Sequence, residues 1–335
     1  MIGFIGLFWD LPEGLSQYKN EKDAKIPLES FYIERKGGGF RKLYSKLNFG
    51  LSTGFGKTSV SHQLNGYGIF QDPNVAPTLF YGNTVGTGYS NWFNAVTPVT
   101  NTQTAQSVIV NSDVGKMGFK SKGYNIPIKA TLHVEILKRF RLGGGYSYEF
   151  MFLSPFKPFG SAVQVSSFAS PVGTAKIQKY FGLIGGSVYR YYEYLLVVDA
   201  QIGAFKLSRN FDRATMKKGV MINLGLTAER EMSEYFKLFI RPSYELKGFK
   251  RLMPEATISH RLNGFYINIG ASYRFPELRR CYNKDCHVQI NHAHGNRDYR
   301  SRVHPIYKKQ NPHYGENYPT LLKYKGKNKK KLNPY

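Results

Sequence analysis

The sequence predicts an all-β protein: an eight-stranded antiparallel up-and-down transmembrane β-barrel followed by an extended, largely irregular C-terminal tail. Three observations lead to this prediction. Apolar and polar residues alternate along eight segments between residues 40 and 275. Most of these segments are about 10 to 14 residues long, more than the usual soluble strand but suited to a tilted membrane-crossing one. Short and long connections follow the segments in turn.

The composition excludes several other classes of protein. Hydrophobic residues make up 41% and aromatic residues 15% of the 335 positions, which is too much for a chain that is disordered throughout. The mean hydropathy is −0.39, and no run reaches the roughly 18 apolar residues that a membrane-spanning helix needs. Two cysteines are too few for a disulfide scaffold.

Each alternating segment has one apolar and one polar side, because successive side chains of a strand point to opposite faces. The predicted strands are 43–55, 126–136, 142–152, 176–190, 198–204, 220–228, 236–246 and 265–275. The polar sides combine glycine with charges of both signs, which fits a narrow barrel interior where small residues leave room and opposite charges pair. We therefore expect a lumen ion-pair network of Lys129, Glu135, Arg141, Glu149, Asp199, Glu229, Arg241, Glu245 and Arg274.

The connections support a membrane barrel independently. Short links are expected at 137–140, 190–193 and 230–234, and long links at 57–125, 154–175, 208–219 and 248–262. Tight turns on one side and long loops on the other are typical of outer-membrane barrels, whose long loops are extracellular. With an even number of strands, both chain ends are then periplasmic.

Residues 40–275 resemble the small eight-stranded outer-membrane barrels of the OmpA transmembrane type, found in Gram-negative bacteria. The aromatic ending at Tyr273 and Phe275 is similar to the C-terminal insertion signal of such proteins, and the Tyr-, Phe- and Gly-rich style is similar to Bacteroidetes versions. The resemblance rests on pattern and transfers no functional residue. Residues 1–16 are predicted to be a signal peptide and 17–39 a periplasmic segment, with a short ordered arm as the alternative for the N-terminus.

The first long connection, 57–125, is the predicted long extracellular loop. Its residues 58–115 contain no lysine or arginine, in a chain whose formal net charge is +25. Uncharged aromatic residues on such a loop are suited to protein or glycan contact, and the candidates are Tyr81, Tyr89, Trp92 and Phe93. The alternative is that these aromatic residues pack on each other and cap the mouth of the barrel.

The tail, 276–335, is strongly basic and is expected to lie in the periplasm. It holds 14 lysines and arginines against four acidic residues, which favours an acidic partner. The expected partners are outer-membrane lipid, other envelope proteins or peptidoglycan. Nucleic acid is not expected, since the protein is exported. The predicted partner-binding residues are Lys308, Lys309, Lys325, Lys327, Lys329, Lys330 and Lys331.

Cysteines and histidines gather at the start of this tail. The candidate residues are Cys281, Cys286, His287, His292 and His294. A disulfide is the first interpretation, because the periplasm is oxidising. A zinc site is the second, since two thiolates and two imidazoles form a suitable ligand set. Haem attachment is the third, although it ordinarily uses a C-x-x-C-H motif.

No catalytic signature such as G-x-S-x-G, H-E-x-x-H or a P-loop occurs. We therefore expect a non-enzymatic barrel without a cofactor, zinc in the tail excepted. Its expected role is anchor or subunit of an envelope assembly of the secretion or protein-insertion type. The alternatives are a surface adhesion or ligand-binding barrel and a lipid-modifying enzyme, for which inward-facing His133, beside Glu135 and Glu149, is the candidate general base.

Overall fold

The computed structural model describes residues 39–301, apart from 65, 113–114, 138, 192, 234, 287, 289–290 and 295–296. The chain divides into two compact units. The larger comprises Asn48–Glu229 and Leu238–Ser272, and the smaller comprises the described parts of Met1–Leu47, Arg230–Lys237 and Tyr273–Tyr335. The predicted signal peptide and the predicted partner-binding lysines lie outside the described residues.

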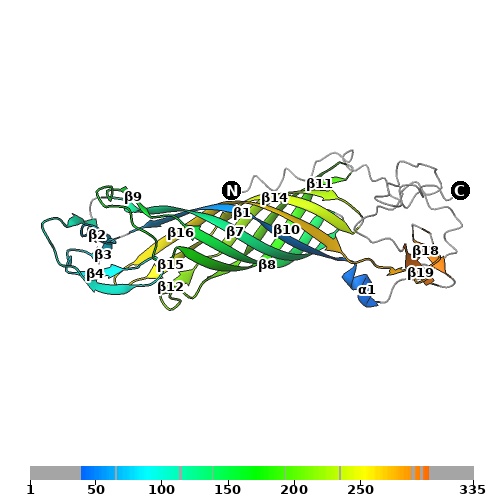
Figure 1. The fold of residues 1–335 in the computed structure, drawn as a ribbon, viewed down its shortest axis with the longest axis horizontal. Helices are drawn as coiled ribbons and strands as arrows, with labels where there is room; N and C mark the ends of the chain where they lie inside the picture. Colours follow the sequence, from blue (N-terminus) through cyan, green and yellow to red (C-terminus); the bar gives the residue numbers. More distant parts are fainter. Residues whose placement is uncertain are drawn as a thin grey trace. The chain divides into compact units, whose positions relative to one another are not determined.

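Within the described residues, eight long strands form a closed ring, which confirms the predicted all-β barrel (Figure 1). The order is β1–β7–β8–β10–β11–β13–β14–β16, and β16 pairs back with β1. Their bounds are Leu47–Gln63 for β1, Met117–Ile136 for β7, Phe140–Leu153 for β8, Thr174–Tyr191 for β10, Tyr194–Leu207 for β11, Met221–Glu231 for β13, Phe236–Leu246 for β14 and Thr257–Arg274 for β16. Three short strands extend the sheet at the long-connection end: β9 (Lys157–Gly160), β12 (Met216–Lys218) and β15 (Gly248–Leu252).

The apolar side of the strands faces outward and the charged side faces inward. On β7, Ile126, Ile128 and Leu132 are exposed, whereas Lys129 and His133 on the opposite face are buried. The same alternation runs along the other ring strands. A soluble barrel or sandwich would show the opposite arrangement, so the outer surface is built to contact hydrocarbon.

Exposed aromatic residues border this apolar band at both ends. Phe140, Tyr191 and Tyr194 lie at the short-turn end, and Tyr124 and Phe152 lie toward the other end. Phe140 and Phe152 are 12 residues apart on β8. At about 3.3 Å per residue and a tilt of about 40°, this distance corresponds to a band roughly 30 Å high, enough to cross a bilayer core.

Some strand ends differ from the prediction. β1 begins at Leu47, because Leu43 belongs to helix α1 (Gly39–Tyr44), and it continues to Gln63 instead of ending at Phe55. β7 begins at Met117 instead of Ile126. Beyond the apolar band the pattern reverses: the outward residues become polar and the inward ones apolar. This reversal hides the continuation of the strands in the sequence.

The first long connection contains a five-stranded sheet of order β5–β4–β3–β2–β6 instead of an irregular loop. The strands are β2 (Tyr67–Gln71), β3 (Thr78–Tyr81), β4 (Thr87–Ser90), β5 (Thr97–Thr100) and β6 (Val108–Val110). This sheet and the three other long connections are called the cap below (residues 64–116, 154–173, 208–220 and 247–256). Figure 1 shows β2, β3 and β4 beyond one end of the ring strands.

The described part of the tail contains a small sheet, called the tail sheet below (residues 279–300). β17 (Arg279–Arg280) runs parallel to β19 (Arg297–Arg300), and β18 (His292–His294) pairs antiparallel with β19. This short sheet is a regular part of a tail that is predicted to be largely irregular. Among the described residues, no helix has the length and apolar character needed to cross a membrane.

Candidate functional site: a filled lumen, a cap and a cysteine–histidine cluster

The cap-side part of the lumen is filled by a cluster of buried charges. Lys179 contacts Glu149 and Glu245, and the Lys247 ammonium lies 2.7 Å from Glu245 and 3.3 Å from Glu149. The Tyr266 hydroxyl donates to Glu149 over 3.0 Å. These residues come from β8, β10, β14, β16 and the residue after β14, so the contacts join strands on opposite sides of the lumen.

A second set of ion pairs lies toward the short-turn end. Arg141 binds Glu229 with both terminal nitrogens, one contact being 2.7 Å, and also lies 3.0 Å from Glu135. Arg241 donates to Asp199 from Nε over 2.9 Å and from Nη2 over 2.5 Å. Such two-pronged contacts are the strongest geometry available to arginine and a carboxylate.

For two predicted members of the ion-pair network, Lys129 and Arg274, the contacts described here are not ion pairs with a carboxylate. Lys129 lies in the lumen but donates to Gln201 over 3.0 Å. Arg274 is the last residue of β16, and its guanidinium is 5.9 Å from the ring centroid of Tyr235. Two central lysines, Lys179 and Lys247, were not predicted as members. Lys179 follows the inward alternation of β10, but the neighbouring inward residues Phe181 and Leu183 obscured this pattern.

The lumen is densely packed. The guanidinium of Arg241 lies directly over Gly225, where an added Cβ atom would be 2.4 Å from its Cζ atom. Glycine therefore makes room for the pair with Asp199. A cavity of about 40 Å³ remains, bordered by His133, Arg141 and Asp199 among others. That volume holds no more than a few water molecules.

The interior of the cap is aromatic and apolar. Trp92 and Phe93 are each 2% exposed, so these two residues pack inside the cap and are not available for surface contact. Their neighbours come from the other long connections: Phe93 lies 5.2 Å from Phe156 and 5.4 Å from Phe211 between ring centroids. Tyr81 is 41% exposed and remains on the surface. For Trp92 and Phe93, the structure therefore agrees with the alternative that aromatic residues of this connection pack on each other and cap the mouth of the barrel.

Polar contacts tie the connections of the cap together. Arg251 is fully buried, and its guanidinium donates to the carbonyl oxygens of Asp212 over 2.7 Å and Phe93 over 3.2 Å. Glu255 accepts hydrogen bonds from the hydroxyls of Tyr89 over 2.7 Å and Tyr67 over 3.3 Å. The first, third and fourth long connections are thereby joined.

These contacts shift the ionisation of the cap residues. Burial, together with the charge of Glu255, raises the pKa of Tyr67 to about 12. The hydrogen bond to the Glu255 carboxylate raises the pKa of Tyr89. Burial lowers the pKa of Arg251. The Tyr67 phenol therefore stays neutral over a wider pH range than it would in water.

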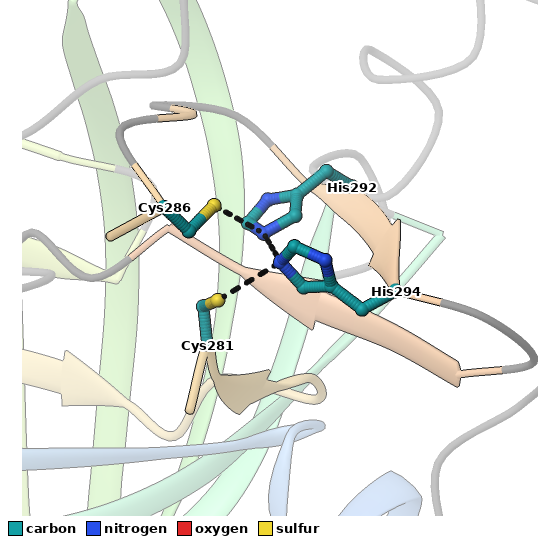
Figure 2. A group of neighbouring side chains, drawn as sticks. All are labelled: Cys281, Cys286, His292 and His294. Carbon is teal, nitrogen blue, oxygen red and sulfur yellow. Dashed lines mark hydrogen bonds between the residues drawn. The ribbon is translucent and has the colours of Figure 1, made fainter. Parts of the chain in front are cut away.

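The tail sheet brings together four of the five predicted cysteine and histidine candidates (Figure 2). The Cys281 Sγ is 3.2 Å from the His294 Nε2, the Cys286 Sγ is 3.2 Å from the His292 Nε2, and the two Nε2 atoms are 3.1 Å apart. No disulfide joins Cys281 and Cys286 in the structure, so the disulfide interpretation does not describe it. The sulfurs point at imidazoles. His287 lies outside the described residues.

Local structure explains this convergence. His292 and His294 are two positions apart on β18, so their side chains share one face of the strand. Cys281 directly follows β17, and its backbone N–H donates to the Arg300 carbonyl over 3.0 Å. Asn283 forms a side-chain turn with Asp285 that leads the chain back to Cys286.

Comparisons with known proteins give no family for this chain. No family model matches it, and no curated protein matches it. Among solved structures, the chain is similar to the outer membrane protease OmpT from Escherichia coli, with 10% identity, 68% of this chain and 96% of that chain covered, and a TM-score of 0.33.

A second similar structure is the outer membrane protein AlkL, with 12% identity, 73% of this chain and 95% of that chain covered, and a TM-score of 0.32. Both similarities have TM-scores below 0.5. The assignment as a membrane barrel therefore rests on the closed strand pairing and the outward apolar band of this chain itself.

Proposed function

We propose that the protein is a non-enzymatic outer-membrane anchor that presents its basic C-terminal segment to another component of the cell envelope. The observation behind the proposal is that the barrel interior is occupied from both ends. Paired charges fill the lumen, and the aromatic interior of the cap occupies the long-connection end. Such an interior offers no path for a solute, while the apolar band supplies attachment to the bilayer.

The remaining feature that calls for a partner is the tail. Residues 276–335 have 14 basic and four acidic residues, a charge that barrel closure does not need. Alternate strands run in opposite directions, so the chain leaves an eight-stranded ring on its short-turn side, which in outer-membrane barrels is periplasmic. There the tail would attract anionic groups: acidic protein surfaces, lipid headgroups or peptidoglycan carboxylates. We favour an acidic protein of a secretion or insertion assembly.

The size of the cavity in the lumen is relevant to the alternative that the protein is a lipid-modifying enzyme with His133 as general base. His133 borders the small cavity together with Arg141 and Asp199, whose charges are satisfied by opposite charges. A cavity of about 40 Å³ has no room for a lipid chain or headgroup. This supports a structural role for His133 and disfavours lipid modification.

The proposal is tested by removing the tail. The full chain and a variant lacking 276–335 are cross-linked in intact cells and purified from solubilised outer membranes, and the attached proteins are compared by mass spectrometry. Heat-modifiable gel migration confirms that each barrel is folded. We expect at least one acidic envelope protein to be lost with the tail.

A length-matched variant separates the effect of the tail's charge from that of its length. Changing Lys325, Lys327, Lys329, Lys330 and Lys331 to glutamine keeps the length and should weaken the same association. An unchanged set of partners in the truncated variant would refute the anchor proposal. Steady ion conductance of the full chain in planar bilayers would refute the filled lumen.

A further inference from the structure

The cysteine–histidine cluster has nearly the dimensions of a tetrahedral metal site. With Zn–S bonds of about 2.3 Å and Zn–N bonds of about 2.05 Å, tetrahedral geometry sets about 3.3 Å between two nitrogens and about 3.6 Å between nitrogen and sulfur. The corresponding separations here are 3.1 Å and 3.2 Å. All four ligand atoms lie within 4.8 Å of one another. Small side-chain adjustments would bring the four atoms to the distances of a tetrahedral site.

Hydrogen bonding alone explains this arrangement poorly. The Nε2 atom of His294 faces both Cys281 and His292, and that of His292 faces both Cys286 and His294. A ring nitrogen has either one N–H or one lone pair, directed along a single axis, so it serves one such neighbour well. A cation at the centre is approached by all four atoms at once, as the side chains in Figure 2 are arranged.

The tail sheet also lacks the usual means of holding a fold together. Its strands have two, three and four residues. Its apolar side chains are few, and Tyr282 and Val288 are exposed. Segments this small do not bury enough apolar surface to remain ordered without a disulfide or a metal, and here no disulfide joins Cys281 and Cys286.

We propose that Cys281, Cys286, His292 and His294 bind one Zn²⁺ ion, and that this ion holds the tail sheet together. Two thiolates and two imidazoles suit zinc in both charge and softness, and the two thiols release their protons on binding. All four positions are filled by protein groups, which is typical of a structural site and leaves none for a substrate. The inference is independent of the proposed anchor function.

The test measures metal in the full-length protein purified in detergent under reducing conditions. We expect one zinc ion per chain by elemental analysis, and strong visible absorption after replacement by Co²⁺, as tetrahedral thiolate sites give. Cys281→Ser and His294→Asn should lose most of the metal and the cobalt spectrum. His287→Asn and His304→Asn are the matched controls and should keep both.

A second measurement reports folding of the segment. Chelation of the metal should make residues 276–301 more sensitive to protease, and added Zn²⁺ should restore resistance in the wild type but not in Cys281→Ser. Unchanged heat-modifiable migration shows that each variant still has a folded barrel. Reduced protein that takes up neither Zn²⁺ nor Co²⁺ would overturn the proposal. Protein isolated from membranes with Cys281 and Cys286 joined in a disulfide would also overturn it.

Discussion

The lumen of the barrel and the tail sheet both bring polar side chains together, but the partners of these side chains differ in kind. In the lumen, basic residues such as Lys179 and Arg241 face carboxylates supplied by other strands. In the tail sheet, sulfurs and imidazoles face one another, and no carboxylate belongs to the four-residue group. In the lumen, the positive and negative side chains neutralise each other. In the tail sheet, the thiolate and imidazole groups all donate electron pairs, so a cation is needed to hold them together. The difference predicts which region depends on an added ion.

The largest effect is expected from breaking the lumen cluster. Glu149→Gln leaves Lys179 and Lys247 with only Glu245 as a carboxylate partner, so one positive charge is buried without compensation. The cost should be about 3–5 kcal/mol of unfolding free energy, measured by urea titration of the barrel in lipid vesicles. Glu135→Gln is the matched control, since Glu135 is 22% exposed, and should cost less than about 1 kcal/mol. If both variants lost the same unfolding free energy, the buried cluster around Glu149 would not be the source of the stability of the lumen.

The second largest effect is expected in the cap. Within the larger unit, the cap is held by apolar packing, whereas the lumen is held by ion pairs. Phe93→Ala should destabilise the cap by about 3 kcal/mol, since it leaves a cavity among Phe156, Phe211 and Phe249. The fluorescence of neighbouring Trp92 and protease cleavage in residues 64–116 report the change. Tyr81→Ala removes a ring that is 41% exposed and packs on Tyr67 from one side, so its effect should be much smaller than that of Phe93→Ala. If Tyr81→Ala loosened the cap as much, the packed interior would not be its source of stability.

The stability of the cap should fall at high pH, where the Tyr67 phenol loses its proton. Its pKa is raised to about 12 in the folded protein, so the folded state retains the phenol proton better than the unfolded state does. The contribution is complete below about pH 10 and is lost as the pH rises toward 12, by at most about 2–3 kcal/mol. Protease sensitivity of the cap between pH 9 and 12 measures this loss. Tyr67→Phe should flatten the profile, and an unchanged profile in that variant would rule Tyr67 out as its cause.

The smallest expected effect is that of metal removal on the unfolding free energy of the barrel. Chelation, or the double variant Cys281→Ser and Cys286→Ser, should change the unfolding free energy of the barrel by less than about 0.5 kcal/mol. The reason is that the ion pairs of the lumen contain no sulfur or imidazole ligand of the cluster. A loss of several kcal/mol in barrel stability on chelation would show that the two regions share one source of stability.

The sequence by itself determined the barrel and its inside-out arrangement. Alternation with period two fixes which side chains share a face, and the charges and glycines on one face identify it as the interior. Glu149, Asp199, Arg241 and Glu245 could therefore be placed in the lumen from pattern alone. The partner of each could not, because pairing across a barrel depends on strand order and stagger, which a period of two does not contain.

Tertiary structure alone decided the cap and the cluster. Past the apolar band, Val60 and Phe119 point inward while Lys57 and Lys120 point outward, so the rule that identified strands inside the membrane reverses in water. The burial of Trp92 and Phe93 depends on three other connections that are distant in sequence. Likewise, the spacing of Cys281, Cys286, His292 and His294 allowed either a disulfide or a metal. Only the turn and the pairing of both β17 and β18 with β19 bring the four ligand atoms together.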